Sequence, residues 1–257
     1  MEFVSNQVQH VQTMNHVIDV MRQRLHVFQE SGDHRAVFHR VYLLMTQEMQ
    51  KRLASGFFQD TVWMERVLVG FAKFYFNAMD VYEAGLPCSP AWELAFREAA
   101  VKYGFVLQDA LLGINAHINN DLPLALYMIL SEDQAWPDAR IMLKRRRDHE
   151  LINDVLADLV DQVQDELTLH YARLIGVIDR IMWRRDESLS KFILTHCRTT
   201  VWHNTELLLD ASNEEQWVIE RRRIERDAYA IGQKVAYYRP FRFMKKLAPL
   251  SRRGRWF

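Results

Sequence analysis

The residues best suited to chemistry in this sequence of 257 residues are a histidine and an aspartate in a strongly apolar segment. His117 and Asp121 lie within residues 105–130, the most hydrophobic of the helical patterns. Because an α-helix turns by about 100° per residue, the two side chains lie about 40° apart on one apolar face. Burying a carboxylate is costly unless it is paired, hydrogen-bonded or bound to a metal. The pair is therefore either a structural contact in a helix kinked by Pro123, or an acid/base or metal-binding centre.

Two further histidines extend the metal-binding interpretation. His196 and His203 fall with Thr200 on an apolar stripe of the helical pattern over residues 188–209, within about 60° of one another. With the first pair they would supply the nitrogen and oxygen ligands that zinc or iron accepts. The candidate ligands of such a divalent metal ion are His117, Asp121, His196 and His203. A metal-free pair, in which the aspartate orients the imidazole, is the alternative.

A third helical pattern begins near Asp148 and adds two more candidates. Its apolar stripe consists of Ile152, Val155, Leu156, Leu159 and Val163, and its opposite face carries Glu150, Asp154, Asp158, Asp161 and Asp165. Those acidic residues indicate a solvated face, whereas Asp148 lies within the stripe and Asn153 on its flank. Residues 153–161 superficially resemble the second magnesium motif of isoprenoid cyclases. The hydroxyl residue is replaced by Ala157 and no D-D-x-x-D precedes it, so magnesium-dependent isoprenoid diphosphate chemistry is only a third alternative.

Several other kinds of site are excluded by their missing motifs. The chain has no Glu-x-x-His, H-E-x-x-H, G-x-S-x-G, G-x-G-x-x-G or P-loop. Its two cysteines cannot form a disulfide framework, which favours a reducing, cytoplasmic setting. The N-terminus does not resemble a signal peptide, and no run of about 18 apolar residues predicts a membrane span.

The composition predicts that helices position these side chains. Hydrophobic residues make up 49% of the chain, with 9 Gly and 6 Pro, which excludes a disordered protein and disfavours a sandwich, a barrel or a Rossmann sheet. Apolar spacings of three and four predict helices over 4–28, 38–53, 61–81, 90–103, 105–130, 148–163, 167–183, 188–209 and 214–232. Asp60 and Ser89 are expected N-caps, with Pro90 at a first helical position. We therefore expect an all-α, single-domain bundle of about eight to nine helices over residues 1–230.

The last residues differ in charge from the rest of the chain. The overall charge is zero, but residues 1–230 hold 25 basic and all 33 acidic residues. Residues 231–257 hold the other basic ones: Lys234, Arg239, Arg242, Lys245, Lys246, Arg252, Arg253 and Arg255. This basic, aromatic tail is expected either to fold back on the acidic body or to bind an anionic membrane surface peripherally. Nucleic acid is disfavoured as a partner because the acidic body would repel it.

Several of these motifs resemble one family. The segment Asn115–Leu126 is similar to the signature of an uncharacterised, mainly bacterial family of all-helical domains of unknown function. The resemblance extends to residues 148–157, 38–42, 63–75 and 198–202, and it would cover most of residues 35–210. It implies that the shared pattern includes Asn115, His117, Asn119, Asp121, Asp148 and Asn153. It does not include His196 or His203, and it implies no activity.

The leading hypothesis is a helical enzyme with a buried His/Asp centre that acts on a largely apolar small molecule. His117 would be a general base or metal ligand, and Asp121 would orient it or share the metal. Asn115 and Asn153 would supply hydrogen bonds, with Asp148 as a further contributor. The alternative is a non-catalytic protein that binds lipid or another apolar ligand at a membrane surface.

Overall fold

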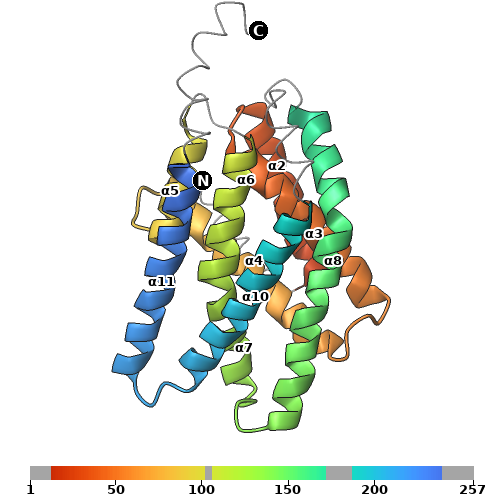
Figure 1. Cartoon of the computed structure of the whole chain (residues 1–257). Helices are drawn as coiled ribbons and strands as arrows, with labels where there is room; N and C mark the ends of the chain where they lie inside the picture. Colours follow the sequence, from red (N-terminus) through yellow and green to blue (C-terminus); the bar gives the residue numbers. More distant parts are fainter. Residues whose placement is uncertain (1–12, 102–105, 172–186, 239–257) are drawn as a thin grey trace, which may run out of the picture.

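A computed structural model describes residues 13–101, 106–171 and 187–238 of the chain (Figure 1). The described residues form nine α-helices and one π-helical turn, which confirms the predicted all-α bundle. The elements are α2 (Met14–Glu30), α3 (Arg35–Ala54), α4 (Thr61–Glu83), α5 (Pro90–Ala99), α6 (Val106–Asn115), η1 (Ala116–Asp121), α7 (Leu122–Glu132), α8 (Ala139–Tyr171), α10 (Glu187–Leu209) and α11 (Glu214–Ala236).

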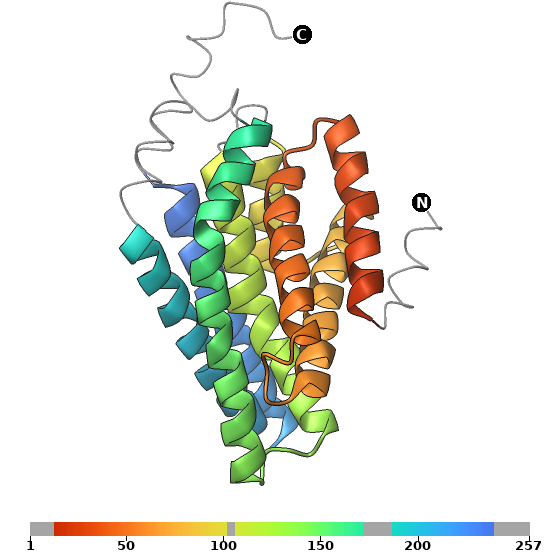
Figure 2. The same cartoon turned by 90° about the vertical axis from the view of Figure 1, so that its right-hand side faces the viewer.

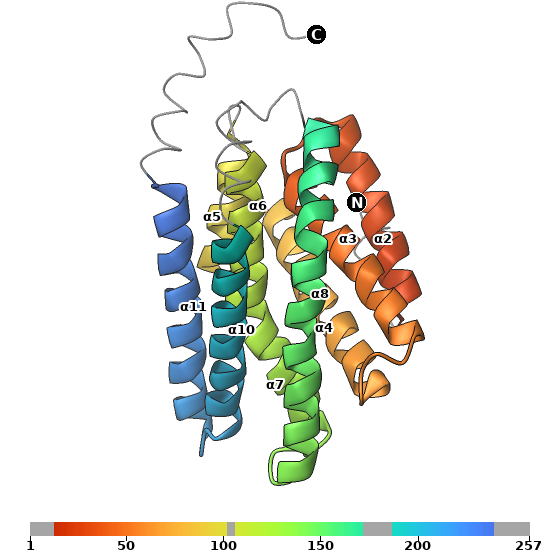
Figure 3. The same cartoon turned by 45° about the vertical axis from the view of Figure 1, so that its right-hand side comes forward.

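The segment α6–η1–α7 runs through the middle of the bundle (Figures 1 and 3). Helices α3, α5 and α11 pack against α6, whereas α4 and α10 pack against α7. Helix α8 lies along α3 and α10 (Figure 2). Helices α2 and α11 form opposite edges (Figure 3). The most apolar segment of the sequence is therefore the one that the other helices surround.

Most helix ends follow the signals in the sequence. The Asp60 carboxylate accepts a hydrogen bond from the backbone N–H of Trp63, and the Ser89 hydroxyl accepts one from the N–H of Trp92, with Pro90 at the start of α5. Gly56 follows the end of α3 with a φ of 69°, a conformation that residues with a Cβ rarely adopt. These contacts confirm the predicted caps of α4 and α5 and the end of α3.

The predicted continuous helix over residues 105–130 is interrupted. At η1 the backbone N–H of Leu122 donates to the carbonyl of His117, a bond between residues five apart, where an α-helix joins residues four apart. Pro123 follows directly and has no N–H to continue the α-helical pattern. The bend expected at the proline is therefore a π-helical turn that contains both His117 and Asp121.

Two other boundaries differ from the prediction. Helix α8 begins at Ala139 instead of near Asp148, because the Asp138 carboxylate accepts hydrogen bonds from the N–H groups of Arg140 and Ile141. Helix α11 continues to Ala236, beyond the predicted boundary at residue 230, so the tail does not begin at 231. The expected membrane contacts of residues 239–257 lie outside the described residues. No helix in the described part is long and apolar enough to cross a membrane.

The predicted apolar face of α10 is wrong. Thr200 and His203 are exposed, and the buried side consists of Arg198, Val201, Trp202, Asn204, Thr205 and Leu208. This side packs toward α7 and α8. The buried side follows the apolar residues Val201 and Leu208 instead of the stripe through His203. The side chain of His196 lies outside the described residues.

Candidate functional site

The structure brings His117 and Asp121 into direct contact at the centre of the bundle. The imidazole Nδ1 lies 3.0 Å from Asp121 Oδ2, and the two residues are only 2% and 3% exposed. Both come from the π-helical turn, whose backbone lies between α6 and α7. The contact between residues on one helical face follows the sequence-based expectation.

Asp121 accepts two further hydrogen bonds. The indole N–H of Trp92 donates to Oδ2 over 2.8 Å, and the Asn120 amide donates to Oδ1 over 2.8 Å. An acceptor of three such bonds is best described as a carboxylate, which assigns the imidazole proton to Nδ1 of His117. The other ring nitrogen, Nε2, then carries an unshared electron pair. It is buried and has no hydrogen-bond partner among the described residues.

Aromatic side chains surround the imidazole. The ring of Phe71 is stacked on it, with centroids 3.5 Å apart and planes at 4°, and Tyr42 approaches edge-on at 4.4 Å. Phe38, Tyr75 and Trp92 complete the surroundings at 5.7 to 6.0 Å. Burial lowers the pKa of His117 despite the opposing effect of Asp121, so the imidazole is neutral near neutral pH.

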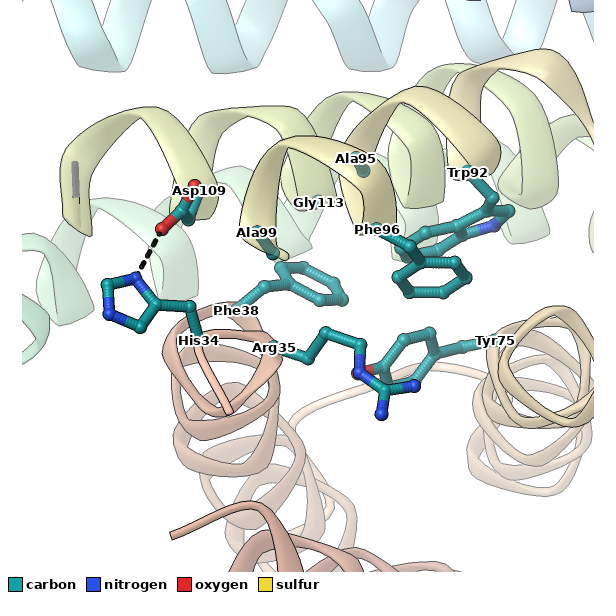
Figure 4. Close-up of a pocket in the computed structure, with 10 residues that line it drawn as sticks. All are labelled: His34, Arg35, Phe38, Tyr75, Trp92, Ala95, Phe96, Ala99, Asp109 and Gly113. Carbon is teal, nitrogen blue, oxygen red and sulfur yellow. Dashed lines mark hydrogen bonds and ion pairs between the residues drawn. The ribbon is translucent and has the colours of Figure 1, made fainter. Parts of the chain in front are cut away.

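A small pocket opens between α3, α4, α5 and α6 (Figure 4). Its lining residues are His34, Arg35, Phe38, Tyr75, Trp92, Ala95, Phe96, Ala99, Asp109 and Gly113. Its volume of about 10 Å³ is close to the minimum for one water molecule. His117 does not line it, but Phe38, Tyr75 and Trp92 lie both at the pocket and beside His117. The pocket and the imidazole are thus separated by one layer of aromatic rings.

Asn115 has a structural contact instead of a place beside the imidazole. Its amide donates to the carbonyl of Ala228 in α11 over 2.9 Å, and its oxygen accepts a hydrogen bond from the Asn119 amide over 2.9 Å. The bond to Ala228 joins α11 to the central segment, and the bond from Asn119 lies within that segment. The expected hydrogen bond from Asn115 to a reacting group therefore has no support in this conformation.

Asp148 and Asn153 are not brought to His117. The Asp148 carboxylate accepts hydrogen bonds from the backbone N–H groups of Gln59 and Asp60, at 2.8 and 2.7 Å, just before α4 begins. Phe71, on which His117 stacks, lies about three turns further along α4. Asn153 is half-buried on α8 and its amide oxygen has no hydrogen-bond partner in the described part. Asp148 holds the α3–α4 connection to α8.

The predicted metal ligands are only partly assembled. His203 is exposed on α10, and the described residues contain no group of three or more His, Cys, Asp or Glu side chains that could hold a metal ion. His117 and Asp121 are the two predicted ligands in contact. In the segment that resembles a magnesium motif, Asp154 and Asp158 are exposed.

Two residues that contact the His117–Asp121 pair from other helices were not predicted from the sequence. Trp92 and Phe71 lie on α5 and α4, and only their positions on apolar stripes mark them in the sequence. Asn120 could have been found because it adjoins Asp121. A second pair, His34 Nδ1 and Asp109 Oδ2, 3.2 Å apart at the pocket, was also missed.

The buried histidines predict that acid destabilises the fold. Burial lowers the pKa of His39 from 6.5 to about 4, so the unfolded chain binds a proton in this range that the folded chain does not. Stability is therefore unaffected by this group above about pH 6.5 and falls as the pH decreases toward 4. At pH 5, His39 alone is expected to lower the free energy of unfolding by about 2 kcal/mol.

Urea unfolding at pH 7 and pH 5 measures this cost. The replacement His39→Gln keeps a donor for the carbonyl of Met21, to which Nε2–H of His39 donates. The loss of stability between the two pH values should be about 2 kcal/mol smaller in this variant than in the unsubstituted protein. Equal losses in the two proteins would contradict the assignment.

Fold and site together define an all-α bundle with a buried pair that consists of a neutral histidine and a carboxylate. The chain belongs to a family of unknown function (DUF5995), whose model matches residues 14–237. The match is wider than the residues 35–210 expected from the motifs, and it includes helices α2 and α11. Neither a curated protein nor a solved structure matches the chain.

Proposed function

We propose that this protein is an enzyme in which His117 acts as a general base on a small, largely apolar molecule. The observation that supports this proposal is the Nε2 atom of His117, which is buried beside a well-bonded Asp121 and has no partner in the part of the chain that the structure describes. A buried polar atom without a partner typically costs about 1–3 kcal/mol. Such a cost is expected where a reacting group will supply the missing partner.

The arrangement suits proton abstraction. Asp121 keeps the proton of the neutral ring on Nδ1, which leaves the electron pair of Nε2 to accept a proton from an O–H, N–H or activated C–H group. The carboxylate then stabilises the imidazolium that forms. The apolar surroundings exclude water, so this electrostatic interaction is stronger than it would be at the surface.

His39 provides a contrast within the same aromatic core. Its Nε2–H donates to the carbonyl of Met21 over 2.8 Å, and its Nδ1 accepts from the Tyr75 hydroxyl over 3.0 Å. Both of its nitrogens are satisfied, as expected of a structural histidine. His117 differs from His39 in the one atom that a base needs.

The ring opening of 5-nitrobenzisoxazole tests the proposal, because this flat, apolar compound reacts when any base removes a single C–H proton. In His117→Asn the amide can replace Nδ1–H, but nothing replaces Nε2. We expect the rate to fall at least about 100-fold in His117→Asn, and to stay within about threefold in His39→Gln. Equal rates in His117→Asn and the unsubstituted protein, with both folded by circular dichroism, would refute the proposal.

The main alternative, a protein that binds an apolar ligand without transforming it, gives a different result. In that case the unsubstituted protein would not accelerate ring opening above the rate in buffer, while 5-nitrobenzisoxazole would still raise the melting temperature. The aromatic surroundings of His117 are compatible with both functions, but an apolar binding site has no use for an Nε2 atom without a partner in the described part of the chain.

A further inference from the structure

We propose that Phe38 occupies the binding site of a small, flat aromatic ligand, and that its ring must swing away for the ligand to reach His117. This inference rests on the proposed function and adds to it the route of entry and the class of ligand. The site consists of the pocket between α3, α4, α5 and α6 together with the space now filled by the Phe38 ring (Figure 4).

Of the three rings between the pocket and His117, Phe38 is the one without a polar anchor. The Trp92 indole is hydrogen-bonded to Asp121 over 2.8 Å, and the Tyr75 hydroxyl is hydrogen-bonded to His39 over 3.0 Å. The Phe38 ring has no polar atom to bond. It is also more exposed, at 7%, than Tyr75 at 0% or Trp92 at 1%. Rotation of Phe38 would break no hydrogen bond.

The Phe38 side chain packs directly against the backbone of Gly113. A Cβ atom added at Gly113 would lie 2.2 Å from Cγ of Phe38 and 2.6 Å from its Cβ, so no larger residue fits beneath the ring. Gly113 is one helical turn before His117, on the same side of the central segment. The space that the Phe38 ring fills is therefore next to the imidazole and continuous with the pocket, which Gly113 also lines.

The space that the Phe38 ring fills has the shape of a six-membered ring. Tyr75 and Trp92 contact the Phe38 ring at centroid distances of 5.2 and 5.6 Å, with planes inclined by 88° and 59°. His117 lies at 6.0 Å and 76°. A flat ring that replaces the phenyl group would meet the same aromatic faces and edges.

The protonation of His117 specifies the polar group of this ligand. Because Nδ1 carries the proton that Asp121 accepts, Nε2 can only accept a hydrogen bond. The ligand should therefore carry a donor, such as the hydroxyl of phenol, and a ring without a donor should bind more weakly. At the pocket, His34 and Asp109 form a polar edge where a second substituent could be bound.

Diethyl pyrocarbonate, which acylates unprotonated imidazole nitrogens, tests the movement of Phe38. The acylation of His117 and His39 is followed by mass spectrometry in the full chain. We expect Phe38→Ala to accelerate acylation of His117 at least about tenfold and to leave His39 unchanged. The control Phe58→Ala removes another buried ring and should leave both rates unchanged. Phe38→Leu, a smaller change, should accelerate His117 to an intermediate degree.

Adding a methyl group at Gly113, against which Phe38 packs, gives an independent measurement. Gly113→Ala should displace the whole Phe38 side chain, including its Cβ and therefore the adjoining turn of α3, and should also accelerate acylation of His117. Gly70→Ala is the matched control, since the nearest atom to its added methyl is the flexible tip of Met128 at 3.2 Å. If neither Phe38→Ala nor Gly113→Ala accelerates His117 relative to its control, Phe38 is not the barrier to entry and the inference is overturned.

Phenol and toluene test the ligand class. In Phe38→Ala, phenol at millimolar concentration should raise the melting temperature more than toluene does, and this preference should disappear in Phe38→Ala with His117→Asn. Equal shifts of the melting temperature with both compounds in Phe38→Ala would contradict the proposal that the ligand must carry a hydrogen-bond donor. These failures are distinguishable from failure of the proposed function, which depends on ring opening by protein that retains Phe38.

Discussion

Replacing Asp121 by Ala is expected to lower the free energy of unfolding by at least about 3 kcal/mol, because three buried donors would lose their acceptor. These donors are the Trp92 indole N–H, the Asn120 amide and Nδ1–H of His117. Each unsatisfied donor costs about 1–3 kcal/mol, and water cannot easily replace the carboxylate in this packed region. Urea unfolding at pH 7 measures the change.

Asp121→Asn is the matched control for this prediction. Its amide oxygen can accept from Trp92 and His117. If the Asn120 amide turns over, the new amide N–H can donate to the Asn120 side-chain oxygen, which is buried and has no partner among the described residues. We expect this variant to lose less than about 2 kcal/mol, yet to open 5-nitrobenzisoxazole at least about tenfold more slowly, because the negative charge is gone. Equal stability losses in the two variants would contradict the hydrogen-bond assignment.

Replacing Asp148 by Ala is expected to lower the free energy of unfolding by about 3–5 kcal/mol. The Asp148 carboxylate is fully buried and accepts hydrogen bonds from two backbone N–H groups, those of Gln59 and Asp60. Hydrogen bonds to charged groups contribute about 1.5–3 kcal/mol each, and no other acceptor for these N–H groups is evident in the described part. Thermal and urea unfolding should both detect the loss.

Asp154 on the same helix provides the control for Asp148. It is exposed, so Asp154→Ala should change stability by less than about 0.5 kcal/mol. Neither variant should change ring opening in the fraction of protein that remains folded. A stable Asp148→Ala variant with greatly reduced ring opening would instead restore the catalytic role expected from the sequence.

Local signals in the sequence predicted the fold well. The capping interactions of Asp60 and Ser89, and the end of α3 at Gly56, involve residues close together in the chain, so their types and spacing are sufficient. The start of α8 differs from the prediction because its apolar stripe begins only after the basic residues 144–147 and therefore does not mark the first turns of the helix. In the structure these basic residues lie within the helix, where Arg145 forms an ion pair with Asp133.

The candidate site was predictable only where its contacts are local in the chain. His117 and Asp121 meet within one turn of the chain, and their spacing was sufficient to predict the contact. The contacts of Trp92 and Phe71 depend on how α5 and α4 pack on the central segment, which helical periodicity does not determine. Asp148 was correctly expected to be buried, but its partners were not foreseen, because a buried carboxylate can accept from a backbone as well as join a catalytic centre.

The nitrogen-15 NMR spectrum of the His117 imidazole is the most direct test of its proposed role as a base. It distinguishes a ring nitrogen that carries a proton from one that does not, and the His117→Asn variant assigns the signals. We expect a proton on Nδ1, none on Nε2, and a ring that is neutral at pH 7, because burial lowers the pKa of His117. A proton on Nε2, or a positively charged imidazole at neutral pH, would contradict the assignment of His117 as a base with its electron pair available.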